Sequence, residues 1–299
     1  MDDCAEIFTE RLSELATAKV PVDMRHWFQC YAFDVIGMIT YAKRIGFLDR
    51  GEDVGNVINA LEDHLSYAST VGVFPSLHKY LYPLKNYMAG SQGSGRAYVI
   101  SFTNERIREA QAIPKATAMT KEGSATQDFL SKFLDKRAEE PETFTADHVL
   151  SGCVSNMVAG SDTTAISLSG VLYYLLKTPA SMKKLQKEVD EFITKGELSV
   201  NPTFKESQQM PYLQAVIKEA LRLHPATGLP LERVVPPGGA TISGNFFPEG
   251  VSISYRRGSA TTVSLTLANR QSLASIHGLL TEILLSGEKT LRPLDPKDG

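Results

Sequence analysis

The chain has 299 residues, of which 42% are hydrophobic and 22% are charged, proportions typical of a globular protein with one large core or two modest domains. With 31 Lys and Arg residues against 34 Asp and Glu residues the net charge is −3, and the absence of a basic stripe argues against a nucleic-acid partner. Cys4, Cys30 and Cys153 are far apart in the sequence, which predicts neither a disulfide framework nor a zinc site and favours an intracellular location.

The first hundred residues predict mainly helices. The opening residues carry no basic segment followed by an apolar one, so we expect neither a signal peptide nor a membrane anchor in this chain. Helical patterns cover residues 4–18, 24–44, 54–71, 81–87 and 98–111. The pattern at 24–44 is apolar nearly all round, as in a buried helix. Residues 113–126 are poor in large apolar side chains and predict an exposed loop.

The second half continues with helices and then changes to strands. Helices are predicted at residues 128–139, 145–176, 180–194 and 211–223. Thr145 and Asp147 supply capping groups for the longest of them, and Pro179 closes it. From residue 229 to 250, Pro and Gly clusters separate short strand-like pieces. We therefore expect a mainly α fold with a long central helix and a small β region near 229–250.

The composition changes after Gly250. Nine of the 25 residues from Val251 to Ser275 are Ser or Thr, and no Asp or Glu occurs between Gly250 and Glu282. The apolar residues follow neither the helix period nor the strand period. We expect one incomplete domain over residues 1–250, followed by an atypical segment, 251–299, that is either disordered or altered in reading frame.

The long helix predicted at 145–176 carries, near its centre, residue types that helix interiors avoid. The run is Ala159-Gly160-Ser161-Asp162-Thr163-Thr164. A glycine costs up to ~1 kcal/mol in such a position, and a buried aspartate needs a partner. The Thr163 hydroxyl would reach the Ala159 carbonyl and bend or open the helix. Two interpretations stay open: a close helix crossing, or a helix opened to hold a ligand, a water molecule or a proton relay.

A second pair of residues lies on the helix predicted at 211–223. Glu219 and Arg222 are three residues apart and therefore neighbours on the helix surface. Taken alone, they are best interpreted as an exposed ion pair. None of the six histidines has a partner at metal-ligand spacing, and the sequence contains neither a glycine-rich phosphate loop nor a nucleophile motif.

Together these segments resemble the cytochrome P450 family. Residues 159–164 are similar to the oxygen-activation motif of that family's long central helix, and Glu219-Ala220-Leu221-Arg222 is similar to its Glu-x-x-Arg motif. Leu223-His224-Pro225 follows that motif, as is usual in the family. The sequence of residues 1–90, including Phe33-Asp34-Val35-Ile36-Gly37, resembles that of fungal members related to pisatin demethylase.

The resemblance implies roles for several side chains around a haem. Asp162 and Thr163 would be catalytic and relay protons to dioxygen bound there. Gly160, with Ala159 beside it, would let the helix approach the cofactor. Arg233 matches the arginine that contacts a haem propionate, and a forked, permanently charged donor suits a carboxylate.

The resemblance also implies an overall activity and its partners. Glu219 and Arg222 would be structural, paired in the core near the proximal side of the haem. The complete enzyme would be a haem-thiolate monooxygenase that inserts one oxygen atom from dioxygen into a small apolar substrate, for example by hydroxylation or O-demethylation. Electrons would come from NADPH through cytochrome P450 reductase. The family is anchored in the endoplasmic reticulum membrane.

One requirement of the family is missing from this sequence. The axial iron ligand is a cysteine thiolate in a loop well after the Glu-x-x-Arg helix, yet no cysteine follows Cys153. Cys153 lies ten residues before Thr163 on the distal helix and cannot replace that ligand. We therefore expect a partial fold that is inactive as this truncated chain and has no metal ligand of its own. The alternatives are a non-catalytic fragment and a helical binding protein that reuses part of the fold.

Overall fold

The computed structural model describes residues 2–89, 95–112, 127–228, 231–255 and 265–268. The chain divides into two compact units, residues 1–227 and residues 228–299, and each is described by itself. The first unit is helical, which confirms the mainly α fold. Its helices are α1 (Asp2–Thr17), α2 (Met24–Tyr41), α3 (Phe47–Arg50), α4 (Val57–Val73), α5 (His78–Ala89), α6 (Gly95–Ala112), α7 (Phe129–Glu139), α8 (Ala146–Lys177), α9 (Pro179–Thr194), α10 (Phe204–Gln208) and α11 (Pro211–Leu223).

The long, strongly patterned helices lie where the sequence predicts them. α8 begins after Thr145, whose backbone N–H donates to Nδ1 of His148 at 3.0 Å, and Asp147 is the acid in the first turn of the helix. α11 has the predicted bounds. The short helices α3 and α10 were not predicted, because four or five residues are too few to show a helical period. The loop predicted at 113–126 lies outside the described residues.

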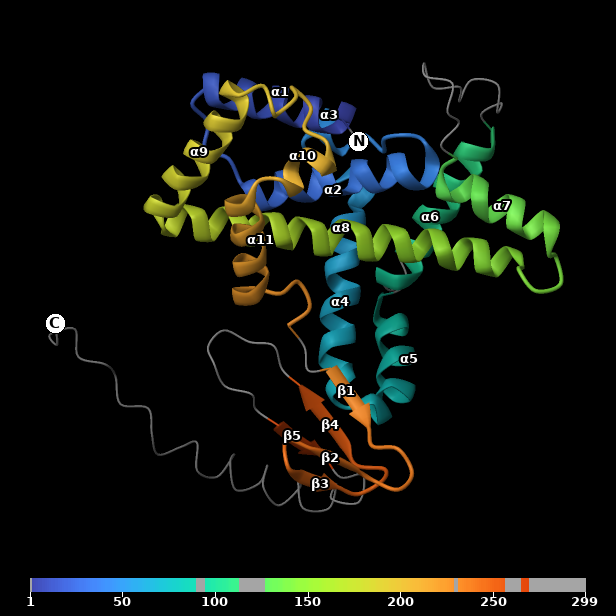
Figure 1. Cartoon of the computed structure of the whole chain (residues 1–299). Helices are drawn as coiled ribbons and strands as arrows, with labels where there is room; N and C mark the ends of the chain where they lie inside the picture. The colour runs from blue at the N-terminus through green and yellow to red at the C-terminus, as the bar shows by residue number, and fades with distance from the viewer. Residues whose placement is uncertain (1, 90–94, 113–126, 229–230, 256–264, 269–299) are drawn as a thin grey trace, which may run out of the picture. The chain divides into compact units, whose positions relative to one another are not determined.

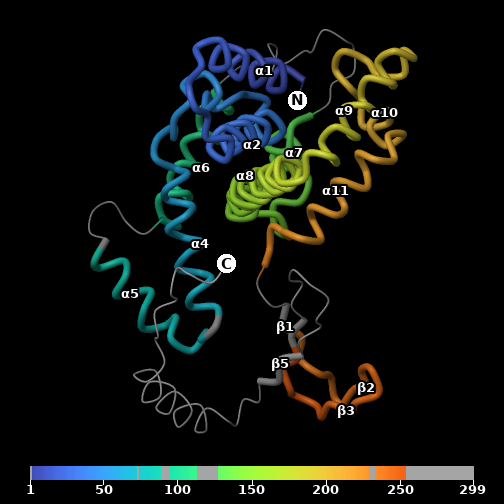
Figure 2. The backbone as a smooth tube through the Cα atoms, turned by 90° about the vertical axis from the view of Figure 1, so that its left-hand side faces the viewer, coloured from blue at the N-terminus to red at the C-terminus, as the bar shows by residue number. Residues whose placement is uncertain are grey.

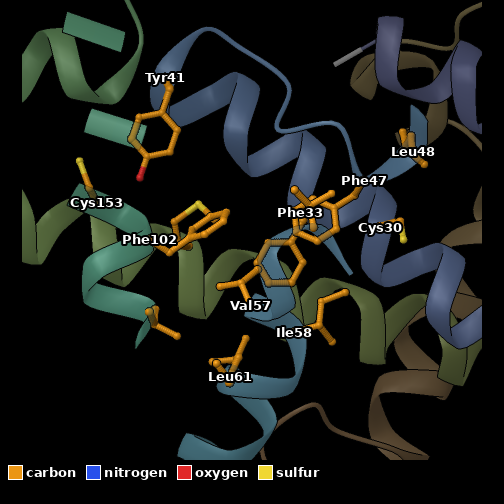
Figure 3. Packing of buried hydrophobic residues seen from close by; sticks show 14 of the residues in the cluster. Cys30, Phe33, Tyr41, Phe47, Leu48, Val57, Ile58, Leu61, Phe102 and Cys153 are labelled. Atoms are coloured by element: carbon orange, nitrogen blue, oxygen red, sulfur yellow. The ribbon is translucent and has the colours of Figure 1, made fainter. Parts of the chain in front are cut away.

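The core of the first unit forms where α2 packs along α8 (Figures 1 and 2). The α2–α8 contact is the most extensive between any two described elements. Buried apolar side chains from α2, α3, α4 and α6 meet beside it (Figure 3), and the rings of Phe33 and Phe47 stack with centroids 4.7 Å apart. Burial of these side chains is the main stabilising term for the unit.

A buried carboxylate fixes the loop between α2 and α3. Asp34 is fully buried on α2, and its carboxylate accepts backbone N–H bonds from Ile45 and Gly46, both at 2.8 Å, and from Leu48 at 2.9 Å. A buried carboxylate needs several donors to offset its loss of solvation. Asp34 therefore holds the start of α3 against α2.

The second unit contains two small antiparallel sheets. β1 (Leu231–Val234), β4 (Ser252–Tyr255) and β5 (Leu265–Ala268) form one sheet in the order β1-β4-β5. β2 (Ala240–Ile242) and β3 (Asn245–Phe247) form a hairpin. Ser243 and Gly244 connect them with φ values of 50° and 80°, as a two-residue hairpin turn requires. The β region predicted near 229–250 is present.

The β region also continues past residue 250. β4 and β5 lie within 251–299, which the sequence predicted to be either disordered or altered in reading frame, and the second compact unit starts at residue 228. The reason is non-local pairing, since Ser252 lies opposite Val234 in the β1–β4 register. Among the described helices, none combines the length and apolarity needed to cross a bilayer.

Candidate functional site

The unusual run on α8 lies within an unbroken helix. The Thr163 hydroxyl donates to the Ala159 carbonyl at 2.7 Å, the bond that the sequence predicts. Ser161 makes the same type of bond to Met157 at 2.5 Å. α8 nevertheless runs continuously from Ala146 to Lys177, so the local opening expected under one interpretation is absent. Each hydroxyl donates a hydrogen bond to the carbonyl four residues back, and the helix stays unbroken.

The run presents two different faces. Ser161 is fully buried and Ala165 is 3% exposed. Ala159 and Thr163, one turn apart on the other side, are exposed. The two predicted residues Ala159 and Thr163 are thus brought together on one open face, where they are accessible to a ligand.

Gly160 allows α8 and α2 to approach closely. A Cβ added at Gly160 would lie 2.6 Å from Cδ1 and 2.9 Å from Cγ1 of Ile36 on α2. A side chain there would overlap Ile36, so the Ile36 side chain or the helices would have to shift. At this position the structure therefore favours the helix-crossing interpretation, and contact of Gly160 with a haem stays a prediction.

Asp162 is half-buried and has an unusual electrostatic environment. Burial raises the pKa of its carboxyl above the usual value, the nearby Arg25 guanidinium lowers the pKa, and Glu62 raises it. Arg25 and Glu62 form an ion pair with each other across α2 and α4, so part of the positive charge is already neutralised. An acid whose pKa is raised in this way holds a proton more readily than an exposed aspartate. Its neighbour Thr163 lies next to it on the helix.

The Glu219–Arg222 pair forms as predicted but lies on the surface. Nε and Nη2 of Arg222 donate to the two carboxylate oxygens of Glu219, both at 2.7 Å. The Arg222 side chain is 55% exposed and that of Glu219 is 56% exposed, so among the described residues the pair is not in the core. The reason is the direction of α11, which buries Ala220 and leaves Glu219 and Arg222 facing solvent. Arg222 lowers the pKa of Glu219.

Arg233 belongs to a different compact unit from the predicted residues on α8. It lies on β1 of the second unit, opposite Ile253 of β4, and its side chain is exposed. The α8 residues belong to the first unit. The structure thus places Ala159 and Thr163 on one exposed face of α8, with the half-buried Asp162 next to Thr163 in sequence, and the haem-propionate role of Arg233 stays a prediction.

The three cysteines do not fit the role of an iron ligand. Cys4, Cys30 and Cys153 are free thiols and fully buried. Burial raises the pKa of all three, to about 12 for Cys30 and Cys153, which keeps them protonated. The described part of the chain also holds no cluster of three or more His, Cys, Asp or Glu side chains arranged for a metal. Contact of α8 with a haem stays a prediction.

Two carboxylates with defined roles were not identified from the sequence. Asp34 holds the loop after α2, and its signal was visible as the one acid within a nearly continuous apolar run. Glu188 on α9 accepts the backbone N–H groups of Tyr212 and Leu213, both at 2.8 Å, and so caps the start of α11. No local pattern identifies Glu188, because its partners lie 24 and 25 residues later.

Comparison with known proteins points to one family. The family model described as Cytochrome P450 matches residues 1–259. Over 254 residues the chain is 37% identical to a cytochrome P450 monooxygenase of Aspergillus terreus, covering 85% of this chain and 51% of that protein. It is 36% identical to a pisatin demethylase of Fusarium vanettenii over 85% of this chain and 48% of the relative. The chain thus spans about half the length of these two relatives.

Proposed function

Since the chain belongs to the cytochrome P450 family, we propose that α8 is the oxygen-activation helix of a P450-type monooxygenase. The activity would be insertion of one oxygen atom into a small apolar substrate, by hydroxylation or O-demethylation. NADPH would supply the electrons through cytochrome P450 reductase. The observation that carries the proposal is Asp162, a half-buried acid with a raised pKa, directly before the exposed Thr163.

In this proposal the two side chains handle a proton in sequence. Asp162 passes a proton to Thr163, and burial raises the pKa of its carboxyl and so favours the form that carries the proton. The Thr163 hydroxyl rests in its bond to the Ala159 carbonyl, and rotation about χ1 would release it toward the open face of α8. The haem, when bound, supplies the oxygen chemistry. The hydroxyl is therefore the group through which a proton reaches that face.

We further propose that this 299-residue chain does not form a thiolate-ligated haem by itself. All of its cysteines are buried thiols, and none follows Cys153. Relatives are about twice as long as the matched region, so the complete centre in this family draws on residues beyond those matched here. The proposed activity is therefore that of a full-length form, and the chain alone is proposed to be non-catalytic.

Carbon monoxide spectroscopy tests the proposal about the chain alone. The purified chain is mixed with haem, reduced and exposed to carbon monoxide, with the Aspergillus terreus relative as the positive control. We expect no thiolate-type Soret band from the chain. Such a band, abolished by Cys153→Ser, would overturn the proposal that its cysteines are unavailable.

A chimera tests the role of α8. Residues 1–259 replace the matching half of the Aspergillus terreus relative, so that the remainder supplies the missing ligand. In this chimera Thr163→Val and Asp162→Asn should each divert electrons from substrate to hydrogen peroxide, whereas Thr163→Ser should not. Unchanged coupling in both variants of an active chimera would reject the proposed relay.

A further inference from the structure

Three buried polar atoms of the first unit lie near one another without a hydrogen-bond partner. Among the described residues, five buried side-chain nitrogen or oxygen atoms have no partner, and three of them are Oη of Tyr41, Oγ1 of Thr103 and Nε of Arg106. Tyr41 is the last residue of α2, and Thr103 and Arg106 lie one turn apart on the same face of α6. Buried polar groups are nearly always hydrogen-bonded, so three exceptions in one region require an explanation.

The two hydroxyls are close to each other but do not pair. Burial is the main influence on the pKa of Tyr41 and raises it, as does Cys153, whereas the Arg106 guanidinium and the Thr103 hydroxyl lower it. Tyr41 thus lies near residues of both α6 and α8. Figure 3 shows its ring extending from α2 toward Phe102 and Cys153. Neither hydroxyl, however, reaches the other in hydrogen-bonding geometry.

The surroundings of these atoms are closed to bulk solvent. Thr103 is fully buried and Tyr41 is 6% exposed, and the neighbouring Phe102 and Cys153 are buried as well. A hydroxyl in such a place loses free energy unless another group replaces its bonds to water. The missing partner must therefore be held inside the protein.

Thr103 also lacks the bond that hydroxyls on helices commonly make. The hydroxyls of Thr9 on α1 and Thr163 on α8 each donate to the carbonyl four residues back. Thr103 makes no such bond to the carbonyl of Val99. Its hydroxyl is therefore available to a group that lies between α6 and α2.

We propose that one buried water molecule binds between Tyr41, Thr103 and Arg106. The water accepts a hydrogen bond from Nε of Arg106 and bonds both hydroxyls, each of which can donate or accept. Three such bonds are typical of a buried water. The water joins α6 to the end of α2. The site uses no haem and no residue of the α8 run, so it stands independently of the proposed monooxygenase activity.

Water suits this site better than an anion, because the charge of Arg106 is already offset. Nη2 of Arg106 lies 3.1 Å from a carboxylate oxygen of Glu105 and 2.9 Å from one of Glu109. An anion would therefore bring an uncompensated negative charge into a buried place. A water molecule brings no charge and can both donate and accept.

A crystal structure of the full chain tests the proposal directly. We expect one ordered water whose oxygen lies about 2.7–3.2 Å from Oη of Tyr41, Oγ1 of Thr103 and Nε of Arg106. A direct hydrogen bond between the two hydroxyls, without a water between them, would overturn the proposal.

The sign of the effect of Tyr41→Phe tests the site in solution. If the Tyr41 hydroxyl bonds a water, its removal should lower the midpoint of thermal unfolding by about 2–4 °C. If the hydroxyl had no partner, its removal would relieve an unsatisfied buried group and raise the midpoint. Tyr87→Phe, at an exposed position on α5, is the matched control and should change the midpoint little. A raised or unchanged midpoint in Tyr41→Phe would reject the site.

A double-mutant cycle separates a shared water from a direct bond between Tyr41 and Thr103. Arg106→Lys keeps the positive charge but removes the Nε donor. With a shared water, the shift caused by Tyr41→Phe should be about half as large in the Arg106→Lys background. Arg108→Lys, at an exposed position on α6, should leave that shift unchanged. Full additivity of Tyr41→Phe and Arg106→Lys would reject the three-way site.

The choice of salt tests the anion alternative. The midpoint of the unsubstituted chain should be the same in sodium chloride and in sodium glutamate at equal ionic strength, since glutamate is too large for a site of this kind. A higher midpoint in chloride that disappears in Tyr41→Phe would assign the site to an anion and overturn the proposal.

Discussion

At the scale of single residues, the α8 run separates side chains that support the fold from side chains that are available for chemistry. Gly160 and Ser161 face the packed interior, whereas Ala159 and Thr163 face outward. Asp162 lies between these environments, and burial raises the pKa of its carboxyl. A half-buried acid of this kind lowers stability when it is ionised, a cost that the relay proposed for Asp162 would explain.

The raised pKa of Asp162 predicts a pH-dependent effect on stability. The pKa of Asp162 is higher in the folded state than in the unfolded state. The contribution of Asp162 to the free energy of unfolding is therefore fully present below the unfolded-state pKa and is lost as the pH rises through the folded-state pKa. Asp162→Asn removes the charge and should raise the free energy of unfolding at neutral pH. Below the usual aspartate pKa, where the carboxyl is protonated in both states, that gain should vanish.

Urea denaturation at neutral and acidic pH measures this difference. The exposed Asp190 on α9 supplies the matched control, and Asp190→Asn should change stability little at either pH. A loss of stability in Asp162→Asn at neutral pH would contradict the assignment of burial as the main cause of the raised pKa.

At the scale of elements, two contacts decide how the helices are placed. α2 and α8 meet closely because Gly160 leaves room for Ile36. α9 positions α11 by capping its first turn through Glu188. The periodicity of the sequence predicts the helices themselves, since each apolar face repeats within its own segment. Neither contact was predictable in this way, because each joins residues that are far apart in the chain.

The close α2–α8 approach predicts opposite effects for one substitution at two glycines. Gly160→Ala should lower the free energy of unfolding by about 1–2 kcal/mol, because the overlap with Ile36 outweighs the better helix propensity of alanine. At Gly72 on α4 an added Cβ lies in open space, so Gly72→Ala should raise the free energy of unfolding by up to ~1 kcal/mol. Chemical denaturation of both variants checks the difference. Ile36→Val in the Gly160→Ala background should recover part of the loss, and no recovery would reject the proposed overlap.

The cap on α11 predicts a loss at Glu188 that its neighbour does not share. Glu188→Ala leaves the N–H groups of Tyr212 and Leu213 without their acceptor and should cost about 1–2 kcal/mol. Glu191→Ala, three residues on, removes only a surface contact with Lys187 at 3.7 Å and should cost less than about 1 kcal/mol. Hydrogen exchange should also show faster exchange at the start of α11 in Glu188→Ala. Equal stability losses in the two variants would contradict the capping role.

At the scale of the whole molecule, the sequence predicts the helical unit better than the β unit. The order of helices and the central position of α8 follow from apolar patterning and from the family resemblance. The pairing of β1 with β4 does not, because it joins strands across about 20 residues of intervening chain and leaves no periodic signal. The candidate site shows the same limit, since local residue types point to Thr163 but the exposure of Glu219 and Arg222 depends on the packing of α11.

The division into two units predicts that the helical unit folds on its own. Its hydrophobic cluster is built entirely from residues 4 to 158, well before the boundary at Thr227. A chain that ends at Thr227 should unfold cooperatively, with the same midpoint as the main transition of the full chain. Parallel thermal melts followed by circular dichroism measure both. A non-cooperative melt of the shorter chain would show that the helical unit needs residues after 227.

The two faces of α8 also have an evolutionary consequence. Gly160 is held by packing against Ile36, so selection for folding alone retains it. Thr163 is exposed and its hydroxyl bonds only within its own helix turn, so many residues could replace it at little cost to the fold. In a lineage released from catalysis, substitutions should therefore accumulate at Thr163 sooner than at Gly160. Under the proposed relay, the residue at position 163, and not the one at position 160, would record a loss of that activity.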